Sequence, residues 1–349
     1  MASEPTDHES SSADVEAPGS ETGGPVPRSR FWGWAVGLLA VVLAGSLLAN
    51  WGQYQLWQLL AEEPREVFHS GEEDAEAKLA ILPINGVIMP PLTGRVLSIV
   101  DRIEKDKSVR GLLLAIDSPG GLVADSHQIY HRLERYRSKT GNPVFVTMSR
   151  MATSGGLYVA MGGGPQVRVF AEPTTWTGSI GVIIPRYDLS GLASELGVNS
   201  DPLKTGPLKD SLNPFRKLSD QDRVVWRAIL DDAFDRFVGV VATNRPRLDE
   251  AGVRRLATGQ IYTASQALEN GLVDELGYEE DAIAALRSQL KLARARVVTY
   301  RSRSNWIDLL LGQSRSPGSS ELFREWLEGG VPRAMYLSSW GSLPPPILD

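Results

Sequence analysis

One serine in this chain lies between a predicted buried strand and a predicted helix. Residues 144–148 are apolar and β-branched, as a buried strand requires, and residues 157–161 suit a buried helix. Ser154 lies between them and is followed by two glycines, which allow a substrate backbone to come close. A serine oxygen at this junction lies near the unpaired N–H groups and the positive end of the helix, which stabilise an alkoxide or a tetrahedral oxyanion. The same position also suits a simple N-cap, so a nucleophile and a helix cap are both open interpretations.

Two further stretches with glycines could act together with Ser154. The sequence Asp-Ser-Pro-Gly-Gly at 117–121 follows the predicted strand 112–116, at the strand end where α/β sheets bind ligands. Its glycines, including Gly121, could turn N–H groups into a cleft as an oxyanion hole requires, or they could form an ordinary tight turn. Ser179, within Thr-Gly-Ser-Ile-Gly-Val, could hydrogen-bond a catalytic group or satisfy a backbone carbonyl.

A lysine that could serve as a base follows in Thr-Gly-Pro-Leu-Lys-Asp at 205–210. A solvated lysine is protonated at neutral pH, but desolvation disfavours the charged form, so a desolvated lysine can accept a proton from serine. Ser-Lys pairs replace Ser-His pairs in some hydrolases. Taken alone, Lys209 has the features of a solvated surface lysine. By composition, nearby Lys204 is an equally good candidate.

The composition excludes several other kinds of site. The chain has 349 residues and no Cys, which excludes disulfides, thiolate catalysis and Cys-based metal sites. Only four His are present, so a Ser-His-Asp triad is poorly supported. His127 and His131 have a spacing that can bind zinc, but no HExxH sequence or third ligand accompanies them. We therefore expect no metal and no organic cofactor. The net charge is −6 without a basic region, so we expect no nucleic-acid partner.

The N-terminal part divides into three segments. Residues 1–30 are rich in Ser, Glu, Pro and Gly and predict a disordered acidic tail. Residues 31–51 carry no charge, have Trp near both ends and are long enough to span a bilayer, which predicts a transmembrane anchor; a cleaved signal peptide is the alternative. Arg28 and Arg30 precede this run, so we expect a single-pass protein of the inner (cytoplasmic) membrane with its N-terminus inside. Residues 52–77 are interpreted as a stalk or linker.

The following region alternates strands and helices. Strands are predicted at 79–84, 112–116, 144–148, 167–170 and 297–300, and helices at 92–105, 123–137, 155–161, 218–244, 264–270 and 279–292. This alternation predicts an α/β domain over 78–300 with a largely parallel sheet. Ser219 and Asp222 resemble a capping box. The C-terminal tail 301–349 is interpreted either as a segment that docks onto something, such as a neighbouring subunit, or as a disordered extension.

Taken together, these motifs resemble the signal peptide peptidase A family in its short, single-domain bacterial form. Gly-Gln-Ile-Tyr-Thr-Ala-Ser-Gln-Ala at 259–267 and Gly-Leu-Val-Asp-Glu-Leu-Gly at 271–277 also match, so the resemblance covers about 79–290. It implies the Clp-protease/crotonase superfold of repeated ββα units. Thr153 departs from the family, which usually has Ala there, and Pro-Leu is an unusual sequence before the lysine. Neither departure removes a functional group.

The resemblance also implies a role for each candidate residue. Ser154 would be the nucleophile, Lys209 the base and Ser179 the residue that hydrogen-bonds the base. The N–H groups of Gly121 and Ser154 would form the oxyanion hole. In short members of the family, the serine and lysine of one site come from adjacent subunits, so a homo-oligomeric ring is expected.

The implied function is a membrane-anchored serine endopeptidase that cleaves remnant signal peptides after protein export. A second peptidase interpretation is a quality-control enzyme of the same superfold that cuts other membrane proteins. A crotonase-type acyl-CoA enzyme is a further alternative, because crotonases share the fold and its oxyanion hole. An inactive scaffold protein is the last alternative function. Modification of Ser154 by an active-site-directed reagent distinguishes the peptidases from the others.

Overall fold

Two compact units make up the chain. The computed structural model describes residues 29–60, 64–301 and 335–337. The units consist of residues 1–61 and 62–349.

The first unit contains one helix, α1, over Ser29–Leu60. This helix includes the uncharged run 31–51. Over the residues that the structure describes, no helix reaches the length and apolarity that crossing a membrane needs. The anchor stays a prediction, and most of the predicted tail, 1–28, lies outside the described residues.

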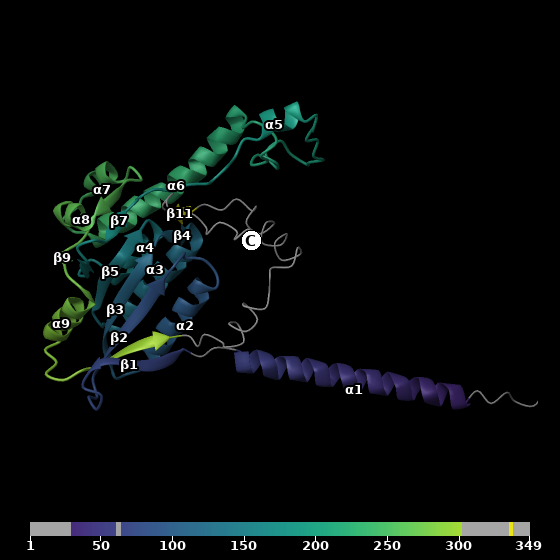
Figure 1. Cartoon of the computed structure of the whole chain (residues 1–349), viewed down its shortest axis with the longest axis horizontal. Helices are drawn as coiled ribbons and strands as arrows, with labels where there is room; N and C mark the ends of the chain where they lie inside the picture. The colour runs from purple at the N-terminus through teal and green to yellow at the C-terminus, as the bar shows by residue number, and fades with distance from the viewer. Residues whose placement is uncertain (1–28, 61–63, 302–334, 338–349) are drawn as a thin grey trace, which may run out of the picture. The chain divides into compact units, whose positions relative to one another are not determined.

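A mixed α/β fold forms the second unit (Figure 1). The strands are β1 (Arg65–Gly71), β2 (Lys78–Asn85), β3 (Val109–Ser118), β4 (Gly120–Leu122), β5 (Val144–Thr153), β6 (Arg168–Ala171), β7 (Trp176–Gly178), β8 (Ile261–Thr263), β9 (Glu275–Leu276), β10 (Arg296–Arg301) and β11 (Met335–Leu337). A nine-stranded sheet has the order β1-β10-β2-β3-β5-β6-β9, with β7 paired to β5 and β8 paired to β7. Its pairs are parallel except β1–β10 and β7–β8. The mostly parallel sheet was predicted from the alternation of elements.

Helices connect these strands. They are α2 (Leu92–Lys105), α3 (Val123–Thr140), α4 (Gly155–Ala160), the 3₁₀ turn η1 (Met161–Gly163), α5 (Ser190–Glu195), α6 (Asp220–Asn244), α7 (Glu250–Leu256), α8 (Ala264–Glu269) and α9 (Glu279–Gln289). Helix α2 has the predicted bounds, and the predicted capping box of Ser219 and Asp222 is present at the start of α6.

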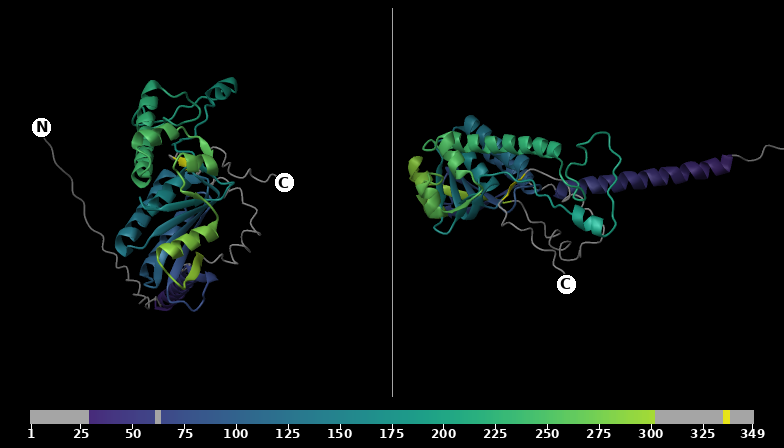
Figure 2. Two further views of the ribbon diagram at one scale, coloured as in Figure 1. Left: turned by 90° about the vertical axis from the view of Figure 1, so that its left-hand side faces the viewer. Right: turned by 90° about the horizontal axis from the view of Figure 1, so that it is seen from above.

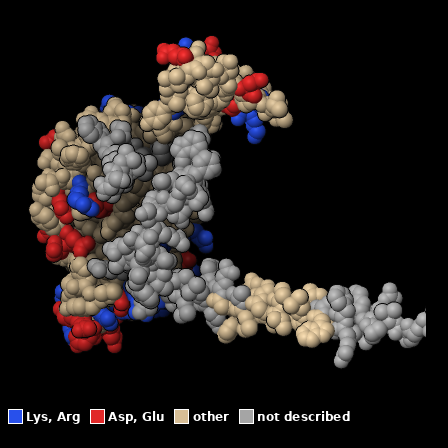
Figure 3. Space-filling view, turned by 45° about the vertical axis from the view of Figure 1, so that its right-hand side comes forward, with Lys and Arg blue, Asp and Glu red and all other residues tan. Residues whose placement is uncertain are grey.

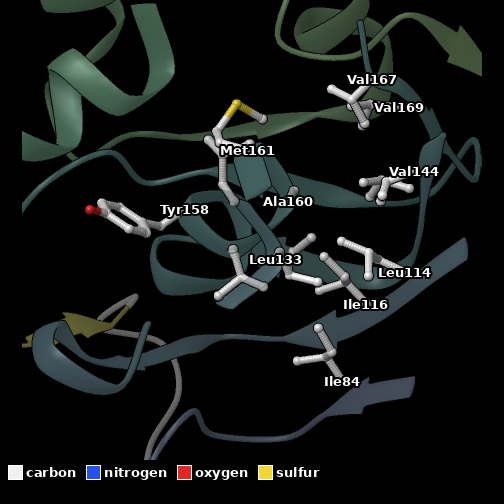
Figure 4. Close-up of a cluster of buried hydrophobic side chains, with 14 of the residues drawn as sticks. Ile84, Leu114, Ile116, Leu133, Val144, Tyr158, Ala160, Met161, Val167 and Val169 are labelled. Atoms are coloured by element: carbon white, nitrogen blue, oxygen red, sulfur yellow. The ribbon is translucent and has the colours of Figure 1, made fainter. Parts of the chain in front are cut away.

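The hydrophobic core lies on both faces of the large sheet. Leu112 and Leu114 of β3 belong to a large buried cluster that also includes side chains of α2, α3, α4 and α6. Figure 4 shows part of this cluster, including Leu114, Leu133 of α3 and Tyr158 of α4. Leu113 belongs to a smaller cluster, to which α9 contributes Leu286. A strand that is buried on both faces is apolar at successive positions, which explains the apolar run 112–116.

The large sheet has an edge strand, β1, that the sequence analysis did not predict. Residues 65–71 were interpreted as part of a linker, whereas β1 pairs antiparallel with β10, from Arg65 opposite Arg301 to Gly71 opposite Arg296. The folded domain therefore begins before residue 78. Burial in β1 is only partial, so its sequence lacks the apolar alternation that identifies a strand. Its partner is more than two hundred residues away and cannot be inferred locally.

Residues 183–229 form a projecting segment that we call the arm. It includes α5 and the N-terminal part of α6 and extends away from the sheet in Figure 1 and in both views of Figure 2. In the space-filling view, most of the projecting surface at the top is uncharged (Figure 3). Its exposed large apolar side chains are Ile183, Tyr187, Leu189, Leu192, Leu196, Val198, Leu203, Phe215, Val224, Val225 and Ile229.

Candidate active site

Ser154 lies at the junction between β5 and α4, as predicted, although β5 continues to Thr153. Its backbone has φ 54° and ψ −114°, a conformation that costs a non-glycine residue about 1–3 kcal/mol. Two hydrogen bonds hold this turn: Ser154 N–H donates to Gly178 O at 2.8 Å, and Tyr158 N–H donates to Ser154 O at 2.9 Å. A strained turn fixed by its surroundings is typical of functional sites.

The Ser154 side chain is not a helix cap. It makes no capping hydrogen bond to α4, and its Oγ is buried without a hydrogen-bond partner among the described residues. A buried hydroxyl normally finds a partner, so an unpaired one at a strained turn requires another explanation. The cap interpretation is therefore wrong, and the nucleophile interpretation accounts for both observations.

The glycines after the serine let α4 approach its neighbours closely. A Cβ on Gly155 would lie 2.6 Å from Ser126 Oγ and 3.0 Å from Gly121 N. A Cβ on Gly156 would lie 3.0 Å from Ser118 O. A Cβ at either position would require neighbouring atoms to shift, so packing favours glycine at both.

Gly121 lies on β4 beside the start of α4. A Cβ there would lie 2.0 Å from Ile88 O, so only glycine fits. Ile88 N–H donates to Gly120 O at 2.8 Å, and Leu122 N–H donates to Ile88 O at 2.8 Å. Because successive residues of a strand direct their N–H and C=O groups to opposite edges, the N–H of Gly121 points to the other edge of β4. That orientation suits a donor to an oxyanion near Ser154.

The second predicted oxyanion donor needs a correction. The N–H of Ser154 donates to Gly178 O and is therefore already used in joining β5 to β7. The N–H of Gly155 is the first of α4, and the first N–H groups of a helix have no acceptor within it. The geometry therefore favours Gly121 and Gly155 as the pair of donors.

Ser179 lies next to Ser154 in the folded chain. It follows β7 directly, and Gly178 of β7 is paired with Thr153 of β5. Ser179 is mostly buried and has φ 52°, and its N–H donates to Gln260 O at 2.6 Å. The structure thus brings together Ser154, Ser179 and Gly121, which the sequence analysis grouped. The role of Ser179 toward a base stays a prediction.

Lys209 is not brought to Ser154 within this chain. The arm segment that carries it is fixed to the N-terminal part of α6, where Trp226 Nε1 donates to Ser211 Oγ at 2.9 Å. Helix α4 contacts α6 further along, where the rings of Tyr158 and Phe237 lie 5.1 Å apart. Trp226 and Phe237 are separated by about 16 Å of helix at 1.5 Å per residue. The lysine and the serine of one chain are therefore well apart.

The two lysines of this segment differ in their partners. Lys204 Nζ lies 2.9 Å from Asp210 Oδ1, and this hydrogen bond, together with Arg216, lowers the pKa of the Asp210 carboxyl. Lys209 is exposed, and within the described part of the chain no ion pair involves it. Because the Lys209 ammonium group is not held in an ion pair there, Lys209 is the better candidate of the two lysines for a base.

His127 and His131 contact side chains of neighbouring residues. His127 Nδ1 lies 2.8 Å from the Tyr158 hydroxyl on α4, and burial lowers the pKa of the His127 imidazole. His131 Nδ1 lies 3.9 Å from Glu134. Among the described residues, no cluster of three or more His, Asp or Glu side chains could hold a metal ion. His127 thus supports the helix that begins after Ser154.

One element of the site was missed by the sequence analysis. Strand β11, from the C-terminal tail, pairs antiparallel with β4, and Tyr336 lies opposite Gly121. The only local signal is a three-residue apolar run, Met-Tyr-Leu at 335–337, within a segment rich in Ser, Pro and Gly. Such a short strand is determined by its partner and not by its own sequence.

Comparison with known proteins identifies the family. Residues 136–293 match Peptidase family S49. An Enterococcus faecium protein with the provisional name signal peptide peptidase SppA is 33% identical over 79% of this chain and 86% of its own length. A provisionally named protease of Synechocystis sp. is 39% identical over 59% of this chain and 72% of its own length. Protease 4 of Salmonella typhi is 31% identical over 68% of this chain and 39% of its own length. The chain therefore belongs to peptidase family S49 and is a serine peptidase that acts on peptide substrates.

Proposed function

We propose that the protein is a membrane-anchored endopeptidase in which Ser154 is the nucleophile and Lys209 the general base. The observation that carries this proposal is the strained Ser154 directly before α4, whose buried Oγ has no hydrogen-bond partner among the described residues, with Gly155 packed closely against Gly121 of β4. The mostly parallel sheet, with β4 outside it in a two-stranded pairing with β11, is compatible with the Clp-protease/crotonase superfold of repeated ββα units.

The reaction follows from these positions. Neutral Lys209 takes the proton from Ser154 Oγ, which attacks the scissile carbonyl carbon. The carbonyl oxygen becomes an oxyanion, and the N–H groups of Gly121 and Gly155 stabilise it. Lys209 then gives the proton to the leaving amine and later takes a proton from the water that hydrolyses the acyl-enzyme. Ser179 would orient the lysine amine beside Ser154.

The base must come from a neighbouring subunit if Lys209 acts on Ser154. Within one chain the two residues are separated, and the arm that carries the lysine exposes many apolar side chains. An apolar surface of this extent is typical of an interface between proteins. We therefore propose a homo-oligomeric ring, in which the arm of one copy supplies Lys209 to Ser154 of the next.

The membrane anchor and the substrate class are part of the same proposal. Between residues 34 and 51, helix α1 exposes apolar side chains, including Trp34, Leu38 and Trp51, as a lipid-facing helix does. An anchor over 31–51 would hold the catalytic domain outside the cytoplasm and close to the bilayer. Apolar signal peptides that remain in the membrane after export are then the substrates within reach. The name of the Enterococcus faecium relative supports this substrate class.

The test is to map a fluorophosphonate adduct on the full-length protein by mass spectrometry. We expect the adduct on Ser154, loss of labelling in Ser154→Ala, and strongly reduced labelling in Lys209→Arg, because arginine does not give up its proton. Lys204→Arg is the matched control, since arginine keeps the ion pair with Asp210, and it should label normally. Labelling of Ser118 or Ser179 in place of Ser154 would overturn the assignment of the nucleophile, and full labelling of Lys209→Arg would overturn that of the base.

The substrate class is tested with the purified enzyme. Signal peptides should be cleaved faster than unfolded membrane proteins that lack them. The reverse preference would favour the quality-control interpretation.

A further inference from the structure

A cavity of about 530 Å³ lies over strands β2, β3 and β5. Its floor includes Pro83, Ala115 and Thr147, which are neighbours in register across these three strands. Ala115 packs against the smaller hydrophobic cluster, to which Leu286 of α9 belongs, whereas the side chains of α4 belong to the large cluster on the other face. The floor of this cavity therefore lies on the face of the sheet opposite to α4, the helix that follows Ser154.

The hydroxyl of Thr147 is a buried polar group without a partner in the fold. Thr147 is only 4% exposed, and its side chain makes no hydrogen bond to any described residue. Its neighbours in the adjacent strands, Ala115 and Phe170, have side chains that cannot form one. A buried hydroxyl normally has a partner, so the partner of this one must come from what fills the cavity.

Two glutamates bring negative charge to the same cavity. Glu172 N–H donates to Met148 O at 3.1 Å, which places this residue beside β5, close to Thr147. Glu279 is the first residue of α9, and its Oε1 lies 3.3 Å from Nε2 of His69, an imidazole that is charged only when protonated. Within the described part of the chain, neither glutamate forms an ion pair with a lysine or an arginine. Both carboxylates are therefore available to a ligand.

The other charged groups of the lining do not neutralise these glutamates. The Asp117 carboxylate is held by Arg150, whose Nε donates to Asp117 Oδ2 at 2.7 Å. Arg95 of α2 also lines the cavity but, among the described residues, is not paired with either glutamate. Burial raises the pKa of the Glu279 carboxyl, and the nearby Glu172 carboxylate adds to this effect. The cavity thus contains negative charge that a bound cation would stabilise.

We propose that this cavity binds a primary ammonium group on an apolar stem, with Glu172 and Glu279 as its charged acceptors and the Thr147 hydroxyl as its third acceptor. An ammonium group has three donors and no acceptor, which matches this set. The apolar side chains of Ile81 and Pro83 line the cavity and suit a stem of methylene groups. The described residues contain no group of three His, Asp or Glu side chains that could hold a metal ion, so an organic cation fits better.

Two sources supply such a group: the N-terminus of a peptide and the side chain of a lysine. A cavity of about 530 Å³ has room for either, since ligand cavities range from about 300 to 1,000 Å³. The binding site includes neither Ser154 nor Lys209, so its occupation is independent of the proposed peptidase chemistry.

The experiment measures binding of n-butylamine, whose chain matches that of a lysine side chain, to the full-length protein. Binding is followed by the broadening of the probe's NMR signals during a titration, and n-butanol is the neutral probe with the same stem. Wild type is compared with Thr147→Val, with Glu279→Gln and with the matched control Glu280→Gln. Glu280 carries the same charge on the next residue of α9, but it is exposed and does not line this cavity.

We expect n-butylamine to bind the wild-type protein at least about tenfold more tightly than n-butanol. Glu279→Gln removes a charged acceptor and should weaken amine binding about tenfold, and Thr147→Val should weaken it about two- to tenfold. Glu280→Gln should change it by less than about twofold. Without a probe, Thr147→Val should unfold at no lower temperature than wild type, because it loses no hydrogen bond within the fold.

Two further probes distinguish the sources of the ammonium group. Dialanine amide has a free N-terminus, whereas lysine amide acetylated at its α-amino group has only the side-chain amine. Tighter binding of the first assigns the cavity to peptide N-termini, and tighter binding of the second assigns it to lysine side chains.

Three results would overturn the proposal. Equal binding of n-butylamine and n-butanol, or no binding of the amine at millimolar concentrations, would show that the cavity does not select an ammonium group. Amine binding that Glu279→Gln and Thr147→Val leave unchanged would show that the amine binds elsewhere. A lower unfolding temperature of Thr147→Val would show that its hydroxyl already has a partner within the fold.

Discussion

At the residue scale, the site is defined by backbone conformation and close packing more than by polar contacts. Ser154 and Ser179 both have positive φ, and each follows a strand of the same parallel pair. Gly155 and Gly121 are glycines because neighbouring atoms leave no room for a Cβ. Ser154, Ser179 and Gly121 were predicted as site residues from their motifs, whereas Gly155 was not predicted as an oxyanion donor. The Gly178 acceptor of Ser154 N–H was not predictable, since it depends on the pairing of two separate strands.

Replacing Gly155 tests the assignment of the oxyanion donors. In Gly155→Ala the new methyl group would lie 2.6 Å from Ser126 Oγ and 3.0 Å from Gly121 N, so it would force the two donors apart. We expect kcat/KM for a peptide substrate to fall about 10²–10³-fold, the cost of losing an oxyanion donor. The folded protein should still form, because the strain is confined to the contacts of one methyl group with Ser126 and Gly121.

Two variants serve as controls for this prediction. Gly94→Ala changes a helical glycine that has nothing within 4 Å of its Cβ position, so activity should be unchanged. Adding Ser126→Gly to Gly155→Ala removes the closest conflicting atom and should restore part of the activity. An active Gly155→Ala enzyme would show that the donors lie elsewhere.

At the scale of elements, the predicted strands and helices are confirmed where the sequence itself carries the pattern. The apolar strands β2, β3 and β6 and the helix α2 lie where expected. The edge strand β1 and the short strands β4, β7, β8, β9 and β11 were missed, because these strands are short or only partly buried and are determined by partners elsewhere in the chain. Long-range pairing of this kind leaves no periodicity in a local sequence.

The start of α6 gives a pH-dependent prediction, because this helix connects the arm to the domain. Hydrogen bonds from Arg216 and Ser219 hold the pKa of Asp222 far below its usual range, against the effect of burial. A carboxyl with a lowered folded-state pKa stabilises the fold at pH values above its unfolded pKa of about 3.9 and loses this effect as the pH falls further. The stabilisation that this carboxylate gives the fold should therefore be complete at neutral pH and decrease in acid.

We expect Asp222→Asn to lower the midpoint of thermal unfolding at pH 7 by about 2–4 °C or more. The difference from wild type should shrink as the pH is lowered from 4 toward 2, because the unfolded state then takes up a proton at Asp222 that the folded state, with its lowered pKa, does not. Asp231→Asn, on the exposed side of the same helix, is the matched control and should change the midpoint little. A difference that stays constant down to pH 2 would contradict the role given to the Asp222 carboxylate.

At the scale of the whole molecule, one copy does not bring together all of the residues that we propose for the site. The serine, the glycine strand and Ser179 come together at the carboxyl ends of the parallel strands. The lysine lies on the arm, where the segment that carries it is bonded to the N-terminal part of α6. The arm exposes apolar side chains. The sequence indicated a site shared between copies only through the long separation of Ser154 and Lys209 along the chain and the lack of a core pattern around Lys209. Because Ser154 and Lys209 are separated in the folded chain, we propose that each site takes these two residues from different copies.

The most direct measurement is complementation between two inactive variants. Ser154→Ala and Lys209→Ala should each lack activity when assembled alone. In a ring of identical junctions, random co-assembly from equal amounts pairs an intact serine with an intact lysine at about a quarter of the junctions. Peptidase activity should then return to roughly that fraction of wild type, while the two variants mixed after separate assembly should remain inactive. If co-assembly is verified by pull-down and no activity returns, both residues act within one chain and the shared site is contradicted.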